Sequence, residues 1–489
     1  MDNKSEKFFS SVMKMASGPM VTQILSILLM PIIVRLYSPE SFGEFALFGS
    51  IVAPIALFSC MGYQTAIMLT KDNESTASIV ALSLLFTSVV SIASACILFF
   101  ITNLYETEIL NLGLDPVIWL IPVIIFMHGI FMILRYWNLK NGHFGNIAVA
   151  NIVLFVGTNS YILGAGFLFG GLGIHLIIAG VVGSLFNIIF LGRRVLDDGL
   201  LGLIKCAEWG GVVNIARRYK QFPQYNLFID LLSRITQYIP IYMFAYFFSQ
   251  TVVGLYALGL RLLNMPMSLL GNSIGEVFFH RDNKDVSPIS GDKVEELFEI
   301  LALLGALPFV ILSLIGDIIF TFAFGDMWSQ AGVYVQILSF YIFLRFITLP
   351  VNYLVIRMEK QKYLLIFNII LVLIHVVAIT IGGLLDNVLV SLGLLSLFAG
   401  IAYGVFGFWI MAKIGVNLYN LYISVLRAVF YCLPSIFVVV VSRLYFDLSP
   451  IIYIVISFFV ATITFFVMIF SEQSLRKPVG ILFKKIVSR

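Results

Sequence analysis

Long apolar runs follow one another along the whole chain, separated by short polar segments. Many of these runs reach twenty residues, the length of an α-helix that crosses the hydrocarbon core of a bilayer. Turn and charge signals divide them into about fourteen segments. The predicted transmembrane helices cover residues 15–34, 42–69, 76–102, 117–137, 147–168, 171–191, 222–248, 252–279, 296–323, 331–356, 363–383, 388–411, 421–444 and 449–470. The pattern therefore predicts an all-α polytopic membrane protein.

Composition supports this prediction and excludes other classes of protein. Hydrophobic residues make up 60% of the 489 positions and charged residues only 11%, which is more apolar surface than one soluble core can bury. The net charge of +4 comes from cations in short loops, so it does not indicate a nucleic-acid-binding face. The four cysteines have no CxxC or Cys/His spacing, and we therefore predict neither a metal site nor a disulfide framework.

Loop charges predict the orientation of the chain in the membrane. With a cytoplasmic N-terminus, the inner loops and termini contain 24 Lys and Arg residues, whereas the outer loops contain only Arg35 and Arg443. Positively charged loops stay on the cytoplasmic side of bacterial membranes. Both termini are therefore predicted to be cytoplasmic.

An internal repeat divides the chain into two lobes. The segment 38–47 resembles the segment 249–258, with four identical residues of ten at a constant offset of 211 positions. Both segments join the first and second helices of a group of six, so the halves would be related by a pseudo-two-fold axis along the membrane normal. The predicted organisation is an N-terminal lobe over 1–191, a cytoplasmic linker over 192–221, a C-terminal lobe over 222–411, and two additional helices with a basic tail over 412–489.

Three arginines fall inside predicted helices, where a charge is unfavourable and often marks a path for a polar substrate. Arg234, Arg261 and Arg345 are therefore candidate ligands of an anion, since a guanidinium binds phosphate through a bidentate fork. For Arg234 a structural alternative stays open, because Asp230 lies four residues earlier on the same helical face and can pair with it.

Other polar residues within the apolar runs are weaker candidates. Gln23 and Gln64 can bind sugar hydroxyls or hydrogen-bond to neighbouring helices. His128 is a candidate substrate ligand, or it can hydrogen-bond to a neighbouring helix. The carboxylates Asp230, Glu276 and Asp317 are candidates for ion coupling, because a group that must bind a proton or cation in one conformation links transport to a gradient.

The segment after the first predicted helix resembles the first-loop pattern of the polysaccharide flippases. Its Arg35, Pro39 and Gly43 correspond to the Arg, the Pro-Glu pair and the aromatic-Gly pair of that pattern, and Gly254 lies in the matching element of the second lobe. The resemblance extends over essentially the whole chain. It is similar in particular to the Wzx branch, the O-antigen flippases of the multidrug, oligosaccharidyl-lipid and polysaccharide exporter superfamily.

This resemblance implies a function in lipopolysaccharide or related polysaccharide biosynthesis. Such a protein translocates an undecaprenyl-pyrophosphate-linked oligosaccharide from the cytoplasmic to the periplasmic leaflet of the bacterial inner membrane by alternating access. It uses no cofactor. A polysaccharide polymerase and a chain-length regulator are the expected protein partners.

Two alternatives remain at this point. A cation-coupled multidrug exporter of the same superfamily would need an acidic cavity for its cationic substrates, whereas the central arginines favour an anion. A membrane polysaccharide polymerase would need a large periplasmic loop with reactive groups, and the predicted outer loops are short. The sequence also has no GxxxxGK[ST] motif, so the chain is not expected to hydrolyse ATP or to act as an enzyme.

Overall fold

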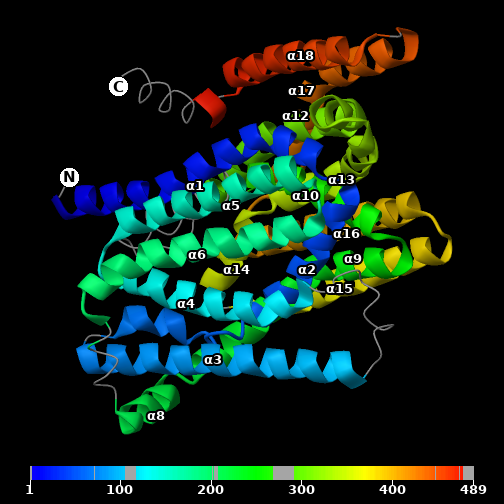
Figure 1. The fold of residues 1–489 in the computed structure, drawn as a ribbon. Coiled ribbons are helices and arrows are strands. Elements are labelled where there is room, and N and C mark those ends of the chain that lie inside the picture. The colour runs from blue at the N-terminus through cyan, green and yellow to red at the C-terminus, as the bar shows by residue number, and fades with distance from the viewer. Residues whose placement is uncertain are drawn as a thin grey trace. The chain divides into compact units, whose positions relative to one another are not determined.

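A computed structural model of the protein describes residues 3–70, 72–104, 117–200, 202, 208–267, 291–358, 360–446, 448–472 and 474–476. These residues form helices and turns and contain no strand (Figure 1). Within them, ten helices are long and apolar enough to cross a membrane, or up to eleven if one sharply bent helix pair counts as a further span. The all-α polytopic fold is confirmed, whereas the number of fourteen spans stays a prediction.

Each of the fourteen predicted segments contains a helix. The helices are α1 (Asn3–Leu36), α2 (Pro39–Ala56), α3 (Asn73–Leu104), α4 (Leu120–Lys140), α5 (Phe144–Phe169), α6 (Gly173–Asp197), α8 (Trp209–Arg218), α9 (Leu227–Phe247), α10 (Gln250–Leu263), α12 (Gly291–Phe324), α13 (Ser329–Ile347), α14 (Pro350–Arg357), α15 (Gln361–Leu384), α16 (Val388–Lys413), α17 (Leu418–Tyr445) and α18 (Pro450–Ser471).

The predicted segments 42–69 and 331–356 are not continuous helices. The segment 42–69 ends as an α-helix at Ala56 and, after a turn, becomes the 3-10 helix η1 (Tyr63–Leu69). The turn needs a left-handed backbone at Gly62, which a continuous helix does not provide. The segment 331–356 divides between α13 and α14, because Pro350 cannot donate a helical hydrogen bond and restricts the residue before it.

The chain forms two compact units. The first contains Met1–Ala245 and Ser249–Gly254, and the second contains Tyr246–Phe248 and Leu255–Arg489. Most of α9, which we assigned to the C-terminal lobe, therefore packs within the first unit. The predicted lobe boundaries themselves stay a prediction.

The two copies of the internal repeat have the same local structure. Ser38 and Ser249 each begin a helix, and each accepts a hydrogen bond through its hydroxyl from the backbone N–H three residues later, over 3.2 Å to Ser41 and 3.3 Å to Val252. A side chain in this position satisfies one of the unpaired N–H groups of a helix start. The serine shared by the two segments therefore caps the start of a helix in both copies.

The glycine shared by the two segments also has a structural role, because the two copies of the repeat contact each other at this residue. A Cβ atom on Gly43 would lie 1.9 Å from the carbonyl oxygen of Gln250, and a Cβ on Gly254 would lie 1.8 Å from that of Pro39. With the repeat offset of 211, Pro39 corresponds to Gln250 and Gly43 to Gly254. The contact is thus symmetric: each segment presents its glycine to the same position of the other. Close backbone approach at small residues is a usual way for membrane helices to pack.

Within the second unit, α12 is kinked at Ile315, where the backbone leaves the helical region. The neighbouring carbonyl of Leu314 accepts hydrogen bonds from the Arg443 guanidinium at 2.7 Å and from the Gln336 amide at 3.3 Å. Arg443 also pairs with Asp317, whose other carboxylate oxygen accepts from Gln336 at 2.8 Å. The kink is therefore stabilised by side chains of α13 and α17, which supply donors to backbone and carboxylate oxygens at the break.

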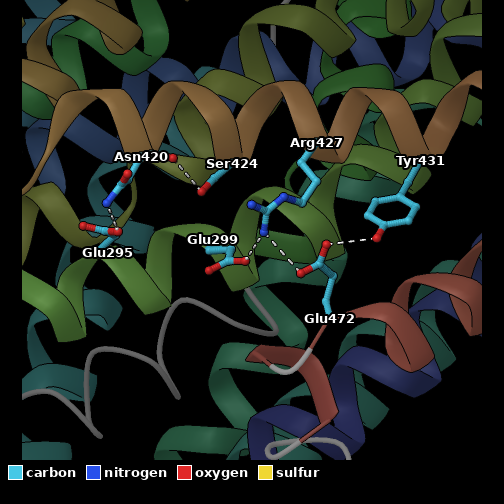
Figure 2. A network of polar contacts seen from close by, with 7 residues as sticks. All are labelled: Glu295, Glu299, Asn420, Ser424, Arg427, Tyr431 and Glu472. Carbon is cyan, nitrogen blue, oxygen red and sulfur yellow. Dashed lines mark hydrogen bonds and ion pairs between the residues drawn. The ribbon is translucent and has the colours of Figure 1, made fainter.

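A second polar network joins α12 to the two C-terminal helices of this unit (Figure 2). Arg427 of α17 lies 3.2 Å from both Glu299 of α12 and Glu472, the residue that follows α18. Tyr431 donates to Glu472 over 2.9 Å, and Asn420 donates to Glu295 over 2.7 Å. Arg427 therefore pairs with two carboxylates, because the packing of α12, α17 and α18 brings them together.

The symmetric glycine contact predicts a matched sensitivity at two distant positions. We expect Gly43→Ala and Gly254→Ala to lower the midpoint of thermal unfolding to a similar extent, because each methyl group must displace a backbone carbonyl, and overpacking of this kind destabilises by about 1–3 kcal/mol. Gly164→Ala on α5 is the control, since no atom lies within 4 Å of its Cβ position. Equal midpoints for all three variants in detergent would show that the contact is not as close as described.

Candidate functional site

The first unit contains a cavity of about 380 Å³ that collects three of the predicted site residues. Gln64 of η1, His128 of α4 and Arg234 of α9 all line it. Apolar and small residues form most of the remaining wall. They are Phe45, Phe48, Gly49, Val52, Ala53 and Ala56 of α2, Leu57 and Ser59 of the following turn, Ile124 and Met132 of α4, and Ile177, Gly180 and Ser184 of α6.

Gln64 reaches the cavity because α2 ends early. The turn after Ala56 contains two residues with positive φ, Met61 at 51° and Gly62 at 80°, and η1 begins directly after it. Thr65 donates to the carbonyl of Gly62 over 2.7 Å and closes the first turn of η1. The Oε1 atom of Gln64 is buried and has no hydrogen-bond partner in the structure. A buried polar oxygen without a partner is unfavourable, so this amide is suited to a ligand that donates a hydrogen bond.

His128 is held in a defined orientation by the same turn. Its Nδ1 lies 3.2 Å from the hydroxyl of Ser59, which itself donates to the carbonyl of Ala56 over 2.7 Å. The imidazole also forms a hydrogen bond with the backbone of Ala56, so the turn after α2 holds the ring at two points. Which ring nitrogen donates follows from the tautomer.

Arg234 supplies the positive charge of the cavity. Its side chain is exposed within the unit, and its charge acts on both His128 and Asp230. In the part of the chain that the structure describes, no carboxylate forms an ion pair with Arg234, so the predicted alternative of a structural pair with Asp230 is not seen. The described lining residues also include no Asp or Glu. The guanidinium is therefore a cation in an otherwise neutral, largely apolar pocket.

The second unit contains the other two arginines. Arg261 is exposed in the last turn of α10. Arg345 of α13 is partly buried, with its guanidinium 6.0 Å from the centre of the Tyr403 ring and within hydrogen-bonding reach of Tyr341. Cation–π contacts and hydroxyl groups can replace a carboxylate as partners of a buried Arg.

The remaining candidates lie apart from this cavity. Gln23 is partly buried on α1 and does not line it. Asp230 is exposed one turn before Arg234. Asp317 is paired with Arg443 at the kink of α12, and Glu276 lies outside the described residues. Arg35 is exposed at the end of α1, whereas Pro39, Gly43 and Gly254 form the buried glycine contact.

Sequence analysis did not single out Ser59 and Ser184 as cavity residues. Serine is common in membrane helices, and nothing in the local pattern separates a lining serine from one that bonds to its own helix. Among the described residues, no group of three His, Cys, Asp or Glu side chains is close enough together to hold a metal ion.

Comparison with known proteins identifies the family. The profile of the family described as polysaccharide biosynthesis protein matches residues 32–331, more than half of the chain. The chain belongs to the polysaccharide biosynthesis protein family. The match begins before the motif at Arg35 and includes the whole lining of the cavity.

Solved structures add the fold of this family member. An inward-facing multidrug resistance MATE family transporter of the MOP superfamily aligns with a TM-score of 0.56 and 14% identity, over 84% of this chain and 99% of that one. A MATE protein in a bent conformation aligns over 84% and 95% of the two chains, with 14% identity and a TM-score of 0.46. No curated protein matches the chain significantly. The first alignment shows a MATE-like fold.

Two glycines of α6, three residues apart, provide a direct test of the cavity. Gly180 faces open space within the cavity, whereas a Cβ on Gly183 would lie 1.9 Å from the Thr158 hydroxyl of α5. We expect Gly180→Leu to keep the thermal unfolding midpoint within a few degrees of wild type, because Leu favours a helix over Gly and has room. Gly183→Leu should unfold at a much lower temperature, because its side chain would collide with Thr158 and overpack the contact between α6 and α5. A similar loss in both variants would mean that no cavity lies beside Gly180.

Proposed function

We propose that this protein is a flippase that moves a diphosphate-linked oligosaccharide lipid, of the undecaprenyl-pyrophosphate class, from the cytoplasmic to the periplasmic leaflet of a bacterial inner membrane. Membership of the polysaccharide biosynthesis family supports a glycan substrate. The MATE-like fold supports transport by alternating access. The observation that carries the proposal is the charge of the cavity: one arginine and no carboxylate among its described lining residues.

The chemistry of the cavity fits the head of such a lipid. Arg234 can form a bidentate, charge-assisted pair with a phosphate. His128 can form a second hydrogen bond through a ring nitrogen, and Gln64 can accept one from a sugar hydroxyl. A volume of about 380 Å³ is at the lower end of small-molecule sites, so the cavity suits the diphosphate and adjoining sugar rather than a whole oligosaccharide with its polyprenyl chain.

The two alternative functions fit the cavity less well. A drug exporter that binds organic cations gains from a carboxylate in its pocket, and the Arg234 guanidinium would repel such a substrate. A polymerase needs groups for acid, base or nucleophilic catalysis within reach of one another. The described lining offers one such pair, Ser59 and His128, and includes no carboxylate to orient the imidazole for catalysis.

The central test is replacement of Arg234 in a flippase-deficient strain that carries the cognate glycan pathway. We expect Arg234→Gln to reduce surface polysaccharide roughly ten- to hundredfold, because a hydrogen bond to a charged group contributes about 1.5–3 kcal/mol. Lipid-linked precursor should accumulate on the cytoplasmic side, and Arg234→Lys should restore part of the export. Arg261→Gln and Arg345→Gln test the other predicted arginines in the same strain.

The matched control is Arg193→Gln, the same change at an exposed position near the end of α6 that does not line the cavity. Membrane levels of all variants are compared by immunoblot. Full export by a well-expressed Arg234→Gln variant would overturn the proposed anion site.

Asp317, one of the predicted ion-coupling residues, has a structural role in this proposal. Because it pairs with Arg443 at the kink of α12, we expect Asp317→Asn to lower the unfolding midpoint by several degrees, and Asp317→Asn with Arg443→Gln to regain part of that loss. The ion dependence of export should be the same in both variants as in wild type. Loss of ion dependence at an unchanged midpoint would instead assign coupling to Asp317. Asp230 and Glu276 remain the candidates for coupling.

A further inference from the structure

The helix α8 precedes α9 and has two distinct faces. Val212 and Ile215 are buried and belong to an apolar cluster with residues of α3 and η1. Trp209 at its start is 68% exposed, and Arg217 and Arg218 at its end are exposed. A short helix with an apolar face, an exposed Trp and terminal cations is typical of a segment that lies along the membrane surface.

The contact of α8 with the first unit is well defined. Tyr63 of η1 donates to the carbonyl of Ala216 over 3.3 Å, and its ring stacks on Phe86 of α3 at 5.7 Å. Gly211 lies against Ser78 near the start of α3, with its Cβ position 3.0 Å from the hydroxyl. Figure 1 shows α8 beside one end of α3. These contacts hold α8 against α3 in a defined position.

Between α3 and α8 lies a groove of about 390 Å³. Its lining is mostly apolar, and two of its residues, Arg217 and Lys220, have cationic side chains. The described lining residues include no carboxylate that would neutralise them. The groove is lined by Leu82 and Leu85 of α3 and by Trp209, Val212, Val213, Ala216, Arg217 and Lys220.

We propose that this groove binds an anionic glycerophospholipid of the cytoplasmic leaflet. An acyl chain would lie along Leu82, Leu85 and Val213, and the phosphate would pair with Arg217 and Lys220. Juxtamembrane Lys and Arg bind anionic lipid surfaces, and a tryptophan favours the level of the head groups. The apolar walls, which include the 41% exposed Leu85, can pack against an acyl chain, whereas free phosphate has no apolar part to contact them.

A lipid in this groove would also affect α9, because α8 precedes that helix in the chain. α8 leads through the π-helical turn Phe222–Asn226 directly into α9, which carries Arg234. A lipid that holds α8 on α3 therefore also fixes the start of the helix that supplies the cation of the cavity. This inference does not depend on the identity of the transported substrate.

Native mass spectrometry of the full-length protein tests the proposal with phosphatidylglycerol and phosphatidylcholine as probes. We expect wild type to retain phosphatidylglycerol in preference to phosphatidylcholine. Arg217→Gln with Lys220→Gln should weaken the tightest phosphatidylglycerol binding by about thirtyfold, since each cation near a lipid surface contributes about 1 kcal/mol. Leu85→Ser should weaken the binding of both lipids, because it removes an apolar side chain from the wall of the groove without changing the charge.

The matched control is Arg218→Gln, which removes the same charge one residue away, where the side chain lies over the Tyr219 ring and does not line the groove. It should keep the preference of wild type, with an unchanged unfolding midpoint for all variants. Equal retention of the two lipids by wild type, an equal loss in Arg218→Gln, or competition by millimolar inorganic phosphate as effective as that by the lipid would each overturn the proposal.

Discussion

Close approach of backbones at small residues holds this chain together, because apolar side chains gain little by leaving a lipid environment for one another. The contact between the segments that contain Gly43 and Gly254 is the clearest case, since a single methyl group on either glycine has no room. The same device recurs at Gly183, where α6 lies against α5. The Gly183 contact brings α6, which lines the cavity through Ser184, close to α5.

The cavity depends on this packing and on one break in a helix. If α2 continued past Ala56, Gln64 would follow the helical period of α2 and not the turn that places it beside His128. The positive φ angles of Met61 and Gly62 redirect the chain and leave the Ser59 hydroxyl facing the imidazole. An arginine without an ion pair is tolerable there because the cavity is open to polar contents, in keeping with a site that receives an anion.

Much of this organisation could be predicted from sequence. Apolar run length identifies the helices, and polar residues within those runs identify Gln64, His128 and Arg234, because each is unfavourable in lipid without a partner. The partners could not be predicted in the same way. Arg443 meets Asp317 across 126 positions, and Arg427 meets Glu472 across 45, so both pairs depend on helix packing that local patterns do not encode. The end of α2 was missed because a run of apolar residues continues through the turn.

The glycine contact is symmetric under exchange of its two segments. Pro39 meets Gly254 and Gln250 meets Gly43, so each copy of the repeat offers the same patch that it receives. A patch of this kind is self-complementary, as in the interface of a two-fold symmetric homodimer. A side chain larger than hydrogen at either glycine would therefore meet the same obstacle, a backbone carbonyl at the equivalent position of the other copy.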